Sequence, residues 1–277
     1  MKTILILLLF FIGHPTSIEA QKKTKIKGDR EVISTSGEIK EPFENIEISD
    51  NISVEIQNGP KNSYILTADQ NLIEEVEIIV KNNTLKIFTK NKITNRKKLD
   101  LYLRLENINS LILNDDAILK NTGKFQANEI RISLHNSSKV DLDLEIEQNA
   151  DFSFFNNSGG KLDLKADNIL INMKDRTDLK GDLDCKELKV TLEKSAGLKI
   201  NGEANNSIYT LECSSNLDAK KLKTKNAVLN SKNSSDIYVH ATKSIEINAE
   251  GKSKVFLYGK PEVKIIGLTD KSRIIKK

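Results

Sequence analysis

Proline is almost missing from this chain of 277 residues, and its absence restricts the fold. The four prolines are Pro15, Pro42, Pro60 and Pro261, so residues 61–260 contain none. A proline in a central strand would remove an amide donor from the hydrogen-bond ladder, so such strands exclude it. A proline-free stretch of this length therefore favours long, uninterrupted β ladders.

Bulky apolar side chains are also scarce. Tryptophan is absent, aromatic residues make up 5% of the chain and hydrophobic residues 38%, whereas 30% of the residues are charged. An ordinary globular chain carries a larger apolar fraction. The interior must therefore be built from Ile, Leu and Val, which suits an elongated molecule with a thin core.

Neither sign of charge dominates. The chain has 43 Lys and Arg against 39 Asp and Glu, a net charge of +4, and the two signs are interleaved. A protein that binds nucleic acid needs a basic stripe to neutralise the phosphate backbone. The densest basic run, residues 95–98, has the composition of a solvated loop. We therefore predict no nucleic-acid partner.

Long hydrophobic runs are missing except at the start, where nine apolar residues, 4–12, follow Lys2. Nine residues are too few to cross a hydrocarbon layer that needs about 20, but they match the core of a signal peptide that ends at Ala20. We predict a signal peptide over 1–20, a flexible leader over 21–41, and a protein exported to the periplasm, the outer-membrane surface or the extracellular space. No later segment is apolar enough to span a membrane, so none is expected after cleavage.

The second half of the chain repeats itself about every 19 residues. Short polar turns begin at Asn136, Asn157, Asp175, Lys194, Cys213, Asn233, Gly251 and Asp270, at intervals, by subtraction, of 21, 18, 19, 19, 20, 18 and 19 residues. An apolar residue follows each turn by four or five positions: Val140, Leu162, Leu179, Leu198, Leu217, Ile237, Val255 and Ile274. Another precedes each turn by four positions, with Ser153 as the one exception: Ile132, Ser153, Ile171, Val190, Tyr209, Leu229, Ile247 and Ile266.

This repeat predicts an all-β fold, a parallel β-helix. Apolar residues alternate within the repeats, as in Leu188, Val190 and Leu192, which is typical of strands. A unit of this length cannot bury its own apolar face, so successive units must stack about 4.8 Å apart. A leucine-rich horseshoe and a β-sandwich are the alternatives, but the first needs a Leu-x-x-Leu-x-Leu frame and the second would not keep so constant a turn register.

We expect the regular coils over 106–277 and an irregular N-terminal β cap over 42–105. The cap would include a hairpin of residues 76–80 and 85–89, joined by a Lys-Asn-Asn-Thr turn over 81–84. Such a segment would protect the open end of the solenoid.

Several segments resemble a known bacterial family. Residues 42–48 (PFENIEI), 52–56 (ISVEI), 83–87 (NTLKI) and 255–263 (VFLYGKPEV) are similar to the "putative auto-transporter adhesin, head GIN domain" family, and the likeness extends over roughly 42–277. The family is typical of Bacteroidetes-type bacteria. The resemblance implies a right-handed β-helix that is exported beyond the inner membrane and, by the family's name, adhesion. The family's Ser-Gly-Ser-Gly turns carry Asn, Asp or Lys here in place of most glycines.

The cysteines and histidines do not predict a metal or cofactor site. Cys185 and Cys213 are 28 positions apart, about one and a half repeats, so they should lie on opposite sides of the coil as two free thiols. His135 and His240, the histidines beyond the signal, are 105 positions apart and have no ligand spacing.

Carboxylates are the residues that could carry catalysis, because parallel β-helices often host polysaccharide lyases and hydrolases. Such enzymes need paired acids, or acids that hold calcium. The candidates alternate with apolar residues or lie in turns, as solvated groups do: Asp115, Asp116, Asp141, Asp143, Asp182 and Asp184. No Gly-x-Ser-x-Gly motif occurs. We therefore predict no catalytic residue.

The leading hypothesis is a non-enzymatic, adhesin-like binding or structural protein of the cell envelope, with a glycan or an envelope protein as its unknown macromolecular partner. The alternative is a carbohydrate-active enzyme, a polysaccharide lyase or hydrolase, which requires the six aspartates to converge. A third hypothesis, an envelope stress or assembly component, differs from the first only in its partners.

Overall fold

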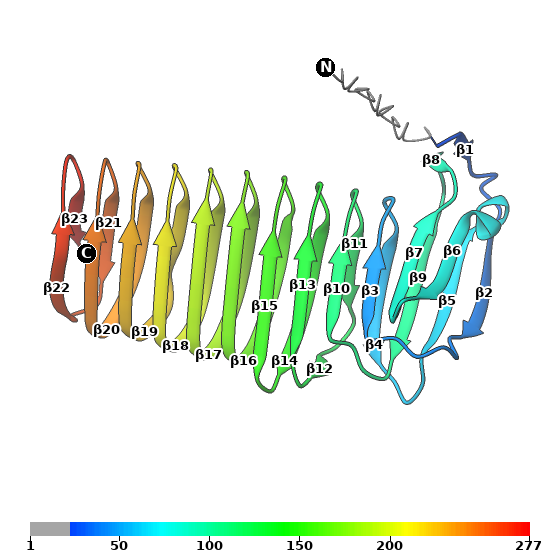
Figure 1. Ribbon diagram of the computed structural model, residues 1–277, viewed down its shortest axis with the longest axis horizontal. Helices are drawn as coiled ribbons and strands as arrows, with labels where there is room; N and C mark the ends of the chain where they lie inside the picture. The colour runs from blue at the N-terminus through cyan, green and yellow to red at the C-terminus, as the bar shows by residue number, and fades with distance from the viewer. Residues whose placement is uncertain (1–22) are drawn as a thin grey trace, which may run out of the picture.

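The computed structural model describes residues 23–277, so the expected signal peptide over 1–20 lies outside the described residues. The chain is nearly all strand and forms a β-solenoid of about 9 turns with coils about 19 residues apart (Figure 1). The predicted fold class is confirmed. The elements are β1 (Lys25–Lys27), β2 (Val32–Glu38), β3 (Asn45–Ile48), β4 (Ser53–Asn58), β5 (Ser63–Asp69), η1 (Gln70–Glu75), β6 (Val76–Lys81), β7 (Thr84–Thr89), β8 (Lys92–Asn95), β9 (Leu99–Leu105), β10 (Ser110–Leu113), β11 (Ile118–Asn121), β12 (Phe125–Ala127), β13 (Ile130–Leu134), β14 (Lys139–Ile146), β15 (Asn149–Phe154), β16 (Gly159–Lys174), β17 (Asp178–Glu193), β18 (Gly197–Leu211), β19 (Asn216–Ser231), β20 (Asp236–Ala249), β21 (Lys254–Tyr258), β22 (Glu262–Leu268) and β23 (Arg273–Lys276).

Each regular coil is a flattened loop with two straight sides. A tight turn closes it at the upper edge of Figure 1, and a wider corner closes it at the lower edge. We call face 1 the outer surface of the half-strands that follow each tight turn, such as residues 178–184, and face 2 that of the half-strands that lead into the next turn, such as residues 187–193. Strands β16–β20 run continuously round the lower corner, and each pairs in parallel with the next.

The core consists of columns of aliphatic side chains between the two sides. Leu198 pairs with Leu217, which pairs with Ile237, and all three are buried. The predicted stacking of these three residues is confirmed. On the opposite side Tyr209 lies between Val190 and Leu229.

Three positions of the predicted register are wrong. One is Ile266, which is exposed, because Ile265 pairs with Ile247 in its place. Asn156 and Asn157 have φ of 54° and 65°, so that turn begins at Asn156, one residue earlier than expected. As a result Phe152, not Ser153, pairs with Ile132 and Ile171, and the apparent exception in the apolar pattern disappears. Gly160, not Leu162, lies between Val140 and Leu179.

The tight turns use pairs of residues in the left-handed conformation. Asn136 and Ser137, and Lys194 and Ser195, are two such pairs, with φ between 51° and 68°. Short polar side chains tolerate this conformation, and several turn side chains bond from coil to coil. Asn156 Nδ2 donates to Asn136 Oδ1 at 3.2 Å, and Asn136 Nδ2 to Asp115 Oδ1 at 3.0 Å.

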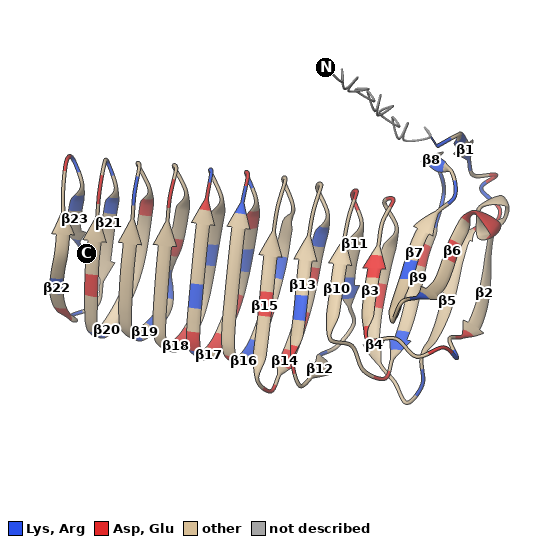
Figure 2. Cartoon of the chain, in the orientation of Figure 1, with Lys and Arg blue, Asp and Glu red and all other residues tan. Residues whose placement is uncertain are grey.

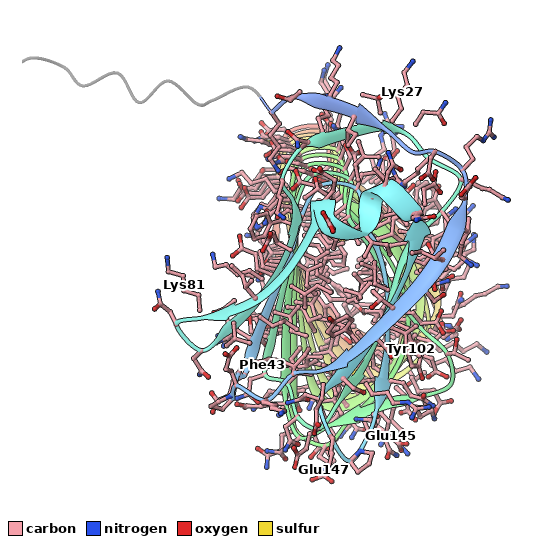
Figure 3. The ribbon with its side chains drawn as sticks, turned by 90° about the vertical axis from the view of Figure 1, so that its right-hand side faces the viewer. Lys27, Phe43, Lys81, Tyr102, Glu145 and Glu147 are labelled. Carbon is pink, nitrogen blue, oxygen red and sulfur yellow. The ribbon has the colours of Figure 1, made fainter. Side chains whose placement is uncertain are left out.

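The N-terminal part is more complex than a simple cap over 42–105, because β3 and β4 form a regular coil. They lie between the coil of β7 and β9 and that of β10 and β11, with parallel pairing on both sides. Strand β5 then adds antiparallel to β9, and β2 to β5. The predicted hairpin is confirmed as β6 and β7, whose tip at Lys81 projects from the solenoid (Figure 3).

Residues 23–41 differ from the expected flexible leader. Strand β2 pairs with β5 along its whole length, and β1 pairs with β8. The buried carboxylate of Asp69 ties this region together by accepting bonds from the backbone amides of Arg30, Lys97 and Lys98 at 2.9 to 3.1 Å. The cause of the order is therefore pairing with residues distant in sequence, which local composition does not reveal.

Candidate functional site

A groove runs along the lower corner of the coils, parallel to the long axis of the solenoid. Its floor is a ladder of buried side chains in which Ala166 pairs with Cys185, Cys185 with Ala204 and Ala204 with Thr224. These side chains are small, so the surface sinks between the larger residues on either side. The corner is therefore concave where a row of Leu or Ile would have filled it.

Polar side chains, all but one of them charged and of both signs, form the two walls. One wall is a ladder at the edge of face 1: Glu145, Lys165, Asp184, Glu203 and Lys223, on β14 and β16–β19. The other wall comes from the corner itself: Glu147, Asp167, Lys186, Asn205 and Lys225. Figure 3 labels Glu145 and Glu147 at this lower corner.

Some wall charges neutralise one another. Lys186 Nζ lies 2.7 Å from Asp167 Oδ2, and Lys165 Nζ lies 3.8 Å from Glu145 Oε1. In the part of the chain that the structure describes, Asp184, Glu203 and Lys223 form no such ion pair. These three side chains can therefore bond a polar ligand.

The groove is long and open, not a closed pocket. It has a volume of about 910 Å³ and is lined by residues from Gln126 on β12 to Thr242 on β20. Seven successive coils at a strand spacing of about 4.8 Å give it a length of about 29 Å. A linear polymer fits such a shape better than a small molecule does, because each coil adds further polar groups at the same spacing.

The thiol in the groove floor is inert. Burial, with the carboxylates of Asp184 and Glu187, raises the pKa of Cys185 to about 12. Because the thiolate is the nucleophilic form, Cys185 remains a protonated, weakly polar side chain at neutral pH. The predicted pair of free thiols is confirmed, with Cys185 buried and Cys213 exposed in a tight turn.

The six candidate aspartates do not converge in a groove. Asp115 and Asp116 form a tight turn, and Asp141 and Asp143 lie on face 1 of β14. Asp182 and Asp184 lie on face 1 of β17, and of the six only Asp184 lines the groove. All six are exposed to solvent.

The histidines are also separate. The ring of His135 stacks on that of Phe155 at 5.0 Å, and His240 Nδ1 lies 3.2 Å from the carbonyl of Lys220 on another coil. Within residues 23–277 no group of three His, Cys, Asp or Glu side chains could hold a metal ion.

The apolar pattern of the sequence does not predict the groove, although a signal for it exists. Ala166, Cys185 and Ala204 recur at intervals of 19 residues, by subtraction, at one corner position of three successive coils, whereas β14 carries Ile146 at this corner. A comparison of the repeats by side-chain volume would have found this column.

Charges over the rest of the surface are mixed. Figure 2 shows basic and acidic residues interspersed along the length of the solenoid. Among the described residues, 23–277, there is no helix of the length and apolar character needed to cross a membrane.

Comparison with known proteins gives a family and a fold. The family model described as "Putative auto-transporter adhesin, head GIN domain" matches residues 42–163 and again 149–261. No curated protein matches the chain.

Three crystal structures from Parabacteroides are similar over almost their whole length. A "putative adhesin" from Parabacteroides merdae is 16% identical, with a TM-score of 0.67 over 92% of this chain and 99% of that chain. A "putative adhesin" from Parabacteroides distasonis is 21% identical, with a TM-score of 0.68 over 91% and 97%. A "putative lipid binding protein" from Parabacteroides distasonis is 18% identical, with a TM-score of 0.64 over 92% and 100%. At these identities the likeness shows a shared fold.

Proposed function

The chain belongs to the "Putative auto-transporter adhesin, head GIN domain" family, and from this premise we propose that it is an exported, non-enzymatic binding protein of the cell envelope. In this proposal residues 1–20 are a cleaved signal peptide and residues 42–277 are the solenoid domain. The domain holds a linear macromolecule, a glycan or an extended segment of an envelope protein, in the corner groove.

The groove is the observation that carries the proposal. Its walls repeat polar contacts on successive coils, so a polymer that lies along it gains many weak bonds at once. Linked contacts of this kind give a high combined affinity without a deep pocket. Charged walls and a narrow floor of small side chains favour a polar chain over a lipid acyl chain, although one similar structure is named for lipid binding.

A non-catalytic role is supported by the chemistry of the same site. The one thiol in the floor is protonated, and the candidate aspartates are divided between β14, β17 and one tight turn. The groove nevertheless contains carboxylates, so the alternative, a carbohydrate-active enzyme, is tested in the same experiment.

The experiment compares purified protein with a groove variant on a panel of glycans and envelope fractions. The variant Asp184→Lys/Glu203→Lys reverses two unpaired wall charges. The control is Glu187→Lys/Glu212→Lys, which makes the same change of net charge outside the groove. We expect saturable binding that the groove variant loses by tenfold or more and the control keeps. Binding that both variants retain, or no saturable binding at all, would refute the role of the groove, and release of shortened glycan would establish the enzyme instead.

The location is tested separately. The proposal predicts a mature N-terminus at Gln21 and recovery of the protein outside the cytoplasm after cell fractionation. An intact N-terminus in the cytoplasmic fraction would contradict export.

A further inference from the structure

Face 1 carries two adjacent ladders of opposite charge. Lys161, Lys180 and Lys199 occupy one outward column, since Lys161 pairs with Lys180 and Lys180 with Lys199. Asp143, Asp163 and Asp182 occupy the next column, two residues further along each strand. All six side chains are exposed. Like charges that lie directly opposite each other on neighbouring strands repel, so each ladder by itself is unfavourable.

The protein does not neutralise these ladders internally. Among residues 23–277 no Lys or Asp of the two ladders has an oppositely charged atom within 4.0 Å. Elsewhere on the surface ion pairs are common, for example Lys264 with Glu246 at 2.7 Å and Lys174 with Glu193 at 3.1 Å. The charged side chains of the two ladders are therefore free to form ion pairs with another molecule.

We propose that face 1 is a self-complementary interface through which two copies of this chain pair side by side with parallel axes. The two-fold axis lies between the ladders and parallel to them. Such an axis exchanges the two columns and keeps each coil at its own height. Lys161 then faces the second copy's Asp163, and Lys180 faces the second copy's Asp182. An interface of this isologous kind makes each contact twice.

The neighbouring coil of β19 does not continue the two ladders. The position after Lys199 is Asp218, and the position after Asn201 in the other column is Lys221, with a β-bulge between them. Asp218 is only partly exposed, and Lys220 Nζ lies 3.1 Å from its carboxylate, so this charge is neutralised within the chain.

The charges also define the orientation and the extent of the interface. If the two copies were antiparallel, each lysine ladder would face the other lysine ladder and repel it. On β14 both columns carry aspartate, Asp141 and Asp143, so like charges would meet there. The pairing of opposite charges is therefore confined to β16 and β17, and on β18 Lys199 faces the uncharged Asn201. This inference does not rest on the groove or on its ligand.

Contacts between exposed charges are weak and screened by salt. The dimer should therefore form at high protein concentration and low ionic strength. Sedimentation equilibrium at a series of salt concentrations is the measurement. We expect the average mass of the native protein to rise towards twice the monomer mass at low salt and to fall back to the monomer mass as salt is added.

Charge-swap variants give the decisive test. Variant A, Lys161→Asp/Lys180→Asp, makes both columns acidic, and variant B, Asp163→Lys/Asp182→Lys, makes both basic. Each alone should remain monomeric because its own columns repel. An equimolar mixture of A and B should form one-to-one dimers, because acidic columns then face basic ones.

Two controls separate this interface from general charge effects. The variant Lys189→Asp/Lys232→Asp changes the net charge as variant A does, but on face 2 and its adjoining turn. It should dimerise like the native protein. Mixed with variant B, it should form no more heterodimer than the native protein does when mixed with variant B. Circular dichroism should show that every variant folds, since all the altered side chains are exposed. Native protein that stays monomeric at low salt, variants A and B that dimerise alone, or a mixture that stays monomeric would each overturn the proposal.

Discussion

The sharpest stability prediction concerns Gly202, where neighbouring coils approach too closely for any side chain. Its φ is +111°, and a Cβ at this position would lie 2.0 Å from the carbonyl oxygen of Leu183 on the coil before. Gly197, on the same strand β18, is the matched control. A Cβ there would find only the carbonyl of Thr177, at 3.9 Å, an ordinary contact.

Gly202→Ala should lower the free energy of unfolding strongly, whereas Gly197→Ala should leave it unchanged or raise it slightly. A non-glycine residue in a sparsely populated backbone region costs about 1–3 kcal/mol. Forcing an extra methyl group into a packed interior costs about 1–3 kcal/mol more. The sum, roughly 2–6 kcal/mol, is a large share of the roughly 5–15 kcal/mol that holds a typical domain folded. Gly197→Ala instead removes flexibility from the unfolded chain, which stabilises by about 0.4–1 kcal/mol where the conformation fits.

Hydrogen exchange measured by mass spectrometry tests this prediction and locates the damage. A solenoid is held together by contacts between neighbouring coils, so its regions can open separately. Gly202→Ala should speed exchange in β17, β18 and β19 and leave β3 and β10 close to native. Faster exchange spread evenly over the chain would contradict the coil-by-coil reasoning, and equal effects of the two glycine substitutions would refute the close approach.

Three further predictions concern buried polar groups. The hydroxyl of Tyr209 is buried with no hydrogen-bond partner among residues 23–277, because Ser207 Oγ donates to Thr224 Oγ1 at 2.9 Å instead. Tyr209→Phe should therefore keep or raise the melting temperature. A clearly lower melting temperature would show that the hydroxyl does form a hydrogen bond in the folded protein. Burial raises the pKa of Asp69, but the bonds from the backbone amides of Lys97, Lys98 and Arg30 outweigh it and hold this pKa below its usual value. Asp69 therefore stabilises the fold fully at a pH above about 3.9, the pKa of this carboxyl in the unfolded chain, and the stabilisation is lost as the pH falls through its lower pKa in the folded protein. Asp69→Asn should therefore make the stability less dependent on pH at the acid end. An unchanged dependence of stability on pH would contradict this. The raised pKa of Cys185 predicts that at pH 8 an alkylating reagent modifies Cys213 and leaves Cys185 unmodified until denaturant is added. Peptide mapping would show which of the two thiols is modified. Equal alkylation rates for the two thiols would be inconsistent with the buried floor of the groove.

The architecture could be predicted because each coil of a parallel solenoid needs apolar residues and turn residues at the same positions, so the sequence repeats. Leu198, Leu217 and Ile237 each follow their turns by the same offset, so a single column could be found without any knowledge of long-range pairing. The misplaced turn at Asn156 shows the limit of this method. The sequence Asn-Asn-Ser-Gly-Gly offers two Asn residues in succession, and only backbone geometry decides which one starts the turn.

The N-terminal part could not be predicted in the same way, because its neighbours in space are distant in sequence. Residues 45–58 form a coil that lies between strands of residues 84–105 and strands of residues 110–121. No local pattern encodes that order. The same limit explains why residues 23–41 suggested a flexible leader, since β2 is polar and gains its order from β5.

The groove could not be predicted for a different physical reason. Its signal is a small side-chain volume at a position that is buried and apolar, like the rest of the core. Ala166, Cys185 and Ala204 are all buried, so the apolar pattern counts them with the interior and gives no hint of a depression. What makes the corner concave is the contrast between these small side chains and the larger polar ones, most of them charged, that flank them. Replacing Ala166 and Ala204 by leucine would keep the apolar pattern but fill the floor. If the groove binds its ligand through shape, this variant should lose binding while its circular dichroism stays native, and ligand binding at full strength would show that the walls alone suffice.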